Sequence, residues 1–71
     1  MTRDDLEQIA RMAELSRVRI ELDADGFLLT KKHSDGRFVR QRLGFVTVFN
    51  AKIPTSVFRT VIRYMDELLG E

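Results

Sequence analysis

A short basic stretch, residues 31–42, holds the side chains of this sequence best suited to bind a charged partner. It carries five lysines and arginines and one aspartate, a local charge of +4 in a chain whose net charge is +1. An Asp-Gly pair between two extended runs is typical of a tight β-hairpin, which would bring these bases together. The stretch therefore predicts a docking surface for an acidic partner. Its residues are Lys31, Lys32, Arg37, Phe38, Arg40 and Arg42, around the turn Asp35-Gly36.

The side-chain types favour nucleic acid as that partner. Arginine beside an exposed aromatic ring suits both phosphate contact and base stacking on single strands. Each base that neutralises a phosphate releases counterions, so the affinity should fall with salt. We expect DNA or RNA, with Arg17, Arg19 and Arg59 assisting the hairpin. The alternative is a solvated edge hairpin whose charges deter edge-to-edge aggregation.

Other polar residues have simpler interpretations. His33 is the sole histidine and stands beside a turn, where we expect it to be exposed. Residues 23–26, Asp-Ala-Asp-Gly, match the start of a calcium loop, but the later ligands of the EF-hand spacing are missing, so we expect a turn. No nucleophile–base pair or glycine-rich phosphate loop is visible. We expect no metal, no cofactor, no small-molecule substrate and no enzymatic activity.

Length and composition predict one small domain, residues 1–71. A chain of 71 residues buries a modest core, and the absence of cysteine excludes disulfides as reinforcement. A partner subunit is the remaining route, so we expect a homodimer. No apolar run approaches the length of a membrane span, and the first residues lack the pattern of a secretory signal. We therefore expect a cytoplasmic protein without a membrane partner.

The periodicity predicts an α+β fold, with a helix, a three-stranded antiparallel β-meander and a second helix (αβββα). Thr2 and Asp5 have the spacing of a capping box, and Gly44 inside the last strand suggests a bulge or a bend. Pro54 near the start and Gly70 at the end frame the last helix. The predicted elements are a helix over 2–15, strands over 17–22, 27–33 and 37–49, and a helix over 55–69.

The assumed turn sorts the strand residues into two faces. A two-residue turn at Asp35-Gly36 pairs Lys31 with Arg40 and Leu29 with Arg42. One face, expected under the helices, then holds Leu28, Val39, Leu43, Phe45 and Phe49. The other face mixes bases with apolar groups, and we expect its basic end to bind nucleic acid. Its apolar end, expected to contact a second copy or another protein, is Phe27, Leu29, Val46 and Val48. The alternative is that the N-terminal helix covers this mixed face.

The expected element order is similar to that of double-stranded-RNA-binding domains. That family carries a lysine cluster at the start of its last helix, where this sequence has Pro54-Thr55-Ser56-Val57-Phe58, so the similarity is one of topology alone. Two further functions stay open beside nucleic-acid binding. One is a protein-binding regulator or inhibitor of phage type, acting on a larger protein complex such as a CRISPR or other nucleic-acid-processing complex. The other is a structural subunit of a homo-oligomer.

Overall fold

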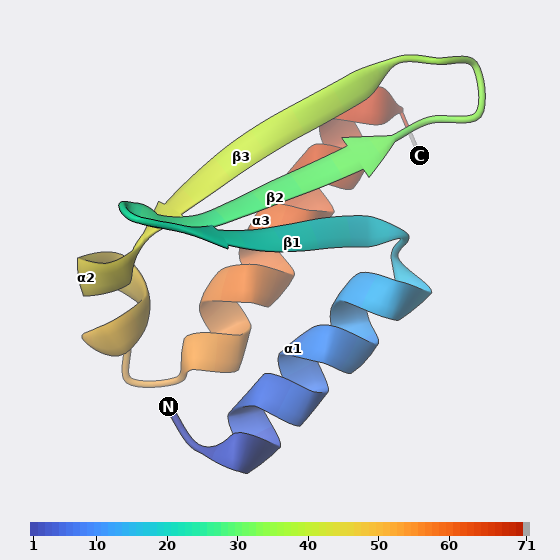
Figure 1. The fold of residues 1–71 in the computed structure, drawn as a ribbon. Coiled ribbons are helices and arrows are strands. Elements are labelled where there is room, and N and C mark those ends of the chain that lie inside the picture. Colours follow the sequence, from blue (N-terminus) through green and yellow to red (C-terminus); the bar gives the residue numbers. More distant parts are fainter. Residues whose placement is uncertain (71) are drawn as a thin grey trace.

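The fold is a three-stranded antiparallel sheet, in the order β1-β2-β3, with its helices on one side (Figure 1). A computed structural model describes residues 1–70 of the chain. The predicted αβββα order of an α+β domain is confirmed, with one additional short helix before the last. The elements are α1 (Arg3–Leu15), β1 (Val18–Asp23), β2 (Gly26–Lys32), β3 (Phe38–Gly44), α2 (Phe45–Phe49) and α3 (Pro54–Leu69).

The two long helices begin and end at local signals in the sequence. Thr2 caps α1, because its hydroxyl accepts from the Asp5 backbone N–H at 3.2 Å while the Asp5 carboxylate accepts from the Thr2 N–H at 2.9 Å. Pro54 stands in the first turn of α3, and Gly70 ends it with a left-handed φ of 76°. No helix within residues 1–70 has both the length and the apolar character that crossing a membrane requires.

The predicted strand over 37–49 is wrong in its second half. β3 ends at Gly44, the residue at which the sequence predicts a bulge or a bend, and the next five residues form α2. An apolar run this short fits a strand or a helix equally well by periodicity. Phe45 and Phe49, four residues apart, stack their rings at a centroid distance of 5.7 Å on one side of the helical turn. Val46 and Val48 thereby separate, with Val46 74% exposed and Val48 fully buried.

The loops of the two hairpins differ in length by one residue. The first has two residues between Asp23 and Gly26, and the Asp23 carboxylate accepts from the backbone N–H groups of Asp25 and Gly26. The second has three, because the His33 N–H donates to the Arg37 carbonyl at 2.7 Å. Gly36 closes this loop with a φ of 96°, a conformation that favours glycine.

The extra loop residue moves the register of β2 against β3 by one position. Lys31 lies opposite Val39 and Lys32 opposite Phe38, so the predicted pairing of Lys31 with Arg40 is wrong. A shift of one residue turns every side chain of a strand to the other face of the sheet. The face that packs on the helices is the inner face, and the opposite one is the outer face.

The core lies between the inner face and the helices. Leu29, predicted on the mixed face, is fully buried. Leu28, predicted under the helices, lies on the outer face and is half-buried. Phe27, also predicted on the mixed face, packs its ring edge-on against that of Phe58, with 5.3 Å between the ring centroids. The buried apolar residues of the core cluster are Ile9, Ala13, Val18, Leu29, Leu43, Val48, Phe58, Ile62 and Met65.

Candidate nucleic-acid interface

The outer face of the sheet is open. Figure 1 shows α1 and α3 together beneath the inner face, and no segment of residues 1–70 crosses the other side. The alternative, in which the N-terminal helix covers the face that carries Phe38, Arg40 and Arg42, is therefore wrong. Alternate positions of the three strands supply the outer-face side chains, which are Arg19, Glu21 and Asp23 from β1, Leu28, Thr30 and Lys32 from β2, and Phe38, Arg40 and Arg42 from β3.

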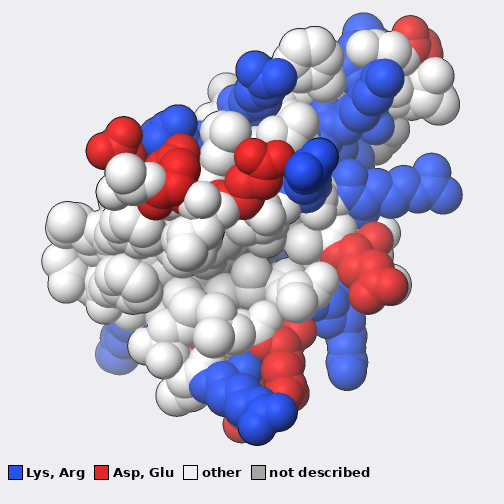
Figure 2. Space-filling model, viewed as in Figure 1, with Lys and Arg blue, Asp and Glu red and all other residues white. Residues whose placement is uncertain are grey.

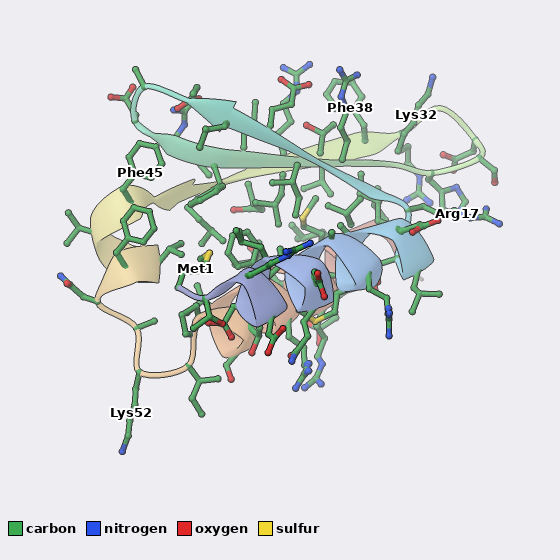
Figure 3. The ribbon with its side chains drawn as sticks, turned by 60° about the horizontal axis from the view of Figure 1, so that its bottom comes forward. Met1, Arg17, Lys32, Phe38, Phe45 and Lys52 are labelled. Atoms are coloured by element: carbon green, nitrogen blue, oxygen red, sulfur yellow. The ribbon has the colours of Figure 1, made fainter. Side chains whose placement is uncertain are left out.

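An exposed aromatic ring beside two bases forms the centre of this surface. Phe38 is 56% exposed, and the Arg40 guanidinium carbon lies 5.0 Å from the centre of its ring. Lys32 is the cross-strand partner of Phe38, and both side chains project from the side of the sheet that faces away from the helices (Figure 3). A guanidinium over a ring holds the ring in place while its remaining N–H groups stay available to an anion.

Among residues 1–70, the cations of the outer face that lack a carboxylate partner lie towards the second hairpin. Arg42 lies 2.8 Å from the Asp23 carboxylate and 3.7 Å from that of Asp25. Among the described residues, no carboxylate lies within 4.0 Å of the charged groups of Lys32 or Arg40. Figure 2 shows the same distribution, with red and blue groups mixed at the β1–β2 turn and mainly blue groups towards the second hairpin.

Asp23 and Asp35, one at each hairpin, remain ionised at neutral pH. The backbone N–H of Asp25, followed by the Arg42 guanidinium, lowers the pKa of the Asp23 carboxyl below its ordinary value. The backbone N–H and guanidinium of Arg37 lower the pKa of Asp35 in the same way. These carboxylates therefore neutralise Arg42 and Arg37, and they leave Lys32 and Arg40 as the principal cations of the outer face.

Two of the predicted binding residues hold the fold together. Lys31 is 6% exposed, points to the inner side and bonds through its ammonium to the Asp66 carboxylate on α3. Arg37 donates to Asp35 at 2.7 Å and to the Leu69 carbonyl at 3.0 Å, so it ties the hairpin loop to the end of α3. The prediction that Lys31 shares a surface with Arg40 is wrong, because the register turns it inward.

The remaining predicted bases lie in different places. Arg19 is on the outer face, 2.9 Å from the Glu21 carboxylate. Arg59 belongs to α3, behind the sheet, and does not join the outer face. Arg17 has a left-handed φ of 57°, uncommon for a residue other than glycine, at the joint between α1 and β1. It lines an open cavity of about 450 Å³, together with Leu15, Ser16, Lys31, Lys32, Ser34 and Asp66.

Sequence reasoning missed Thr30 and Leu28 as outer-face residues. They sit between the charged positions on the central strand, and both are half-buried. The signal that could have found them is Gly36, which fits the last position of a three-residue loop as well as the second position of a two-residue turn. Within the described chain, no three acidic or histidine side chains gather closely enough to hold a metal ion.

Comparison with known proteins adds no identification. No family model, curated protein or solved structure matches this chain.

Proposed function

We propose that the outer face binds single-stranded nucleic acid as a non-enzymatic interaction module. Phe38 would stack on a base, while Lys32 and Arg40 would contact the neighbouring phosphates. The observation that supports this most directly is the exposed Phe38 ring beside the Arg40 guanidinium, on a sheet face that no helix covers. Sheets that present aromatic side chains to unstacked bases are an established way to bind single strands.

The shape of the surface favours single strands over duplexes. A three-stranded sheet is about 10 Å wide across its strands, which matches one extended strand of nucleic acid. The ring of Phe38 can stack only on a base whose face is accessible, and the bases of a duplex cover one another. We therefore expect weaker binding to double-stranded DNA or RNA, through phosphate contacts alone.

The charges predict a shallow dependence on salt. Each phosphate contact on a single strand contributes a slope of about −0.7 to the logarithm of affinity against the logarithm of salt concentration. Contacts from Lys32 and Arg40 alone would give roughly −1.4. If Arg19 and Arg42 exchange their carboxylate partners for phosphates, the slope would approach roughly −2.8.

The experiment is a fluorescence anisotropy titration of labelled single-stranded DNA and RNA at low salt. The decisive variant replaces Arg40 and Arg42 by alanine, and its matched control replaces Arg59 and Arg63, which are exposed on α3 behind the sheet. Both variants lose two positive charges, so a general effect of net charge weakens both equally. We expect the outer-face variant to lose much more affinity and to show a shallower salt slope.

Two results would contradict the proposal. One is the absence of binding to any single-stranded oligonucleotide at low salt, with the protein shown to be folded by circular dichroism. The other is an equal loss of affinity in the Arg40/Arg42 and Arg59/Arg63 variants, which would mean that binding has no preferred face.

A further inference from the structure

A second surface, apolar rather than basic, lies around α2 and the start of α1. Val46 and Phe49 project from α2 and are 74% and 58% exposed. Beside them an open groove of about 170 Å³ runs between α1 and β1, with Leu6 and Ile20 among its lining residues and the buried Phe58 at its base. Figure 2 shows this region as a broad white area with charged groups around its rim.

The projecting helix and the groove form one continuous surface through Phe27. The Phe27 ring lines the groove and lies edge-on to Phe58 at 5.3 Å and to Phe49 at 6.5 Å. Leu22, the cross-strand partner of Phe27 in β1, is 71% exposed and extends the same apolar area. A projection and a hollow therefore stand side by side, both apolar.

We propose that this surface joins two copies of the chain in a two-fold dimer, with α2 of each copy against the groove of the other. In a two-fold dimer the projection of each copy enters the hollow of the other. A surface that carries both features is therefore self-complementary. The groove volume of about 170 Å³ suits one branched aliphatic or aromatic side chain, since an apolar cavity of about 150 Å³ accommodates a benzene ring.

The exposed area supports a second copy as the occupant. Met1, Leu6, Leu22, Val46 and Phe49 together expose on the order of 500 Å² of apolar surface, which is at the upper end for a monomer. A standard interface buries roughly 800 Å² per partner, of which about 60% is apolar, so these residues could supply most of its apolar area. The uncharged centre with charged groups around it (Figure 2) agrees with the usual interface, whose core is depleted of charged residues and whose rim is polar. A chain of 71 residues also gains core from the association.

This dimer does not depend on nucleic-acid binding. The proposed contact involves α1, α2 and the groove beside β1, so the outer face stays open in each copy. A monomer that binds single strands would overturn the dimer alone, and a dimer without affinity for single strands would overturn the proposed function alone.

The first test measures the mass of the nuclease-treated protein by sedimentation equilibrium, from low micromolar to millimolar concentration. We expect twice the chain mass of 8.3 kDa for the wild type. Val46→Glu should shift the mass to that of one chain, because it places a charge at the centre of the contact. The matched control is Leu15→Glu, which changes a 79% exposed leucine at the far end of α1 and should remain a dimer.

The second test places the contact, and it uses the absence of cysteine from the sequence. Chains with Leu6→Cys are mixed with chains with Val46→Cys and treated with a short thiol-specific crosslinker. We expect a mixed crosslinked dimer, and much less of it when Leu15→Cys replaces Leu6→Cys. A wild-type mass of one chain at millimolar concentration, a Val46→Glu variant that still dimerises, or equal crosslinking at Leu6 and Leu15 would each overturn the proposal. So would a monomer that uses α2 to bind a different protein.

Discussion

The inner and outer faces of the sheet assign different roles to neighbouring residues of the same type. Leu29 is fully buried in the core, whereas Leu28, the residue before it, is half-buried on the outer face. Lys31 bonds to Asp66 in the interior, whereas Lys32 is exposed opposite Phe38. The inner face therefore stabilises the fold and the outer face is available for binding. Position along the strand, rather than residue type, decides the role of each side chain.

The largest expected effect distinguishes the two leucines. Leu29→Ala should lower the free energy of unfolding by about 2–5 kcal/mol, because it leaves a cavity in the core. Leu28→Ala should lower the free energy of unfolding by less than about 1 kcal/mol, because Leu28 is open to solvent and its truncation leaves no internal cavity. Urea unfolding followed by circular dichroism measures both. Equal losses of unfolding free energy would show that Leu28 and Leu29 do not point to opposite faces of the sheet.

The two lysines provide the next test. Lys31→Ala should destabilise the protein by about 1–3 kcal/mol, because it removes a buried charged hydrogen bond and the packing of the side-chain stem. Lys32→Ala should leave the unfolding free energy within about 0.5 kcal/mol of the wild type and should weaken binding to single strands. Unfolding and anisotropy titrations of both variants check this. A Lys32→Ala variant that is less stable than Lys31→Ala would contradict the assignment of Lys31 to the inner face and Lys32 to the outer face.

Phe38→Ala sharpens the comparison on the outer face alone. Loss of the stacking ring should weaken binding to single strands by about 1–3 kcal/mol, with the salt slope unchanged because no charge is removed. Phe38→Tyr, which keeps an aromatic ring, is the control and should retain most of the affinity. Anisotropy titrations at several salt concentrations give both quantities. An affinity that is the same for alanine and phenylalanine would exclude stacking at this position.

The smallest expected effect concerns Asp23, which neutralises Arg42. Asp23→Asn keeps an oxygen that can accept from the turn backbone but removes the closer of the two carboxylates beside Arg42, so affinity for single strands should rise and the salt slope should steepen by up to about 0.7. An unchanged slope would show that Arg42 gains no phosphate contact when the Asp23 charge is removed.

The same carboxylate gives a prediction for acid conditions. The pKa of Asp23 is lowered in the fold, so its contribution to stability is present above its unfolded value of about 3.9 and is lost as pH falls through the lower folded value. The wild type should therefore be more stable than Asp23→Asn above about pH 4, and the difference should shrink as the pH falls below that value, which urea unfolding at several pH values followed by circular dichroism measures.

Local signals predicted much of the fold, whereas the register needed information that the local sequence does not contain. The helix ends depend on interactions between near neighbours in the sequence, at Thr2 with Asp5, at Pro54 and at Gly70. The predicted ends of α1 and α3 are therefore correct to within one residue. Ser-Asp-Gly at residues 34–36 fits a two-residue or a three-residue loop. The choice between them depends on how the whole inner face packs against the helices, a tertiary effect.

The candidate site was predictable where it depended on a single strand. Phe38, Arg40 and Arg42 alternate along β3, so they share a face in any register. Lys31 and Leu29 depended on the pairing of two strands, and both were assigned to the wrong face. Val48 was misplaced because residues 45–49 form a helix, in which positions two apart point to nearly opposite sides.

The most direct test of the central claim is an NMR titration of the ¹⁵N-labelled chain with a single-stranded oligonucleotide. We predict that the backbone amide shifts concentrate in the outer-face segments 28–32 and 38–42, with the largest changes around Lys32, Phe38 and Arg40. Amides of α3 should change little, because the sheet separates them from the ligand. Shifts concentrated on α2 or α3, or no shifts at low salt, would contradict the claim that the open face of the sheet binds single strands.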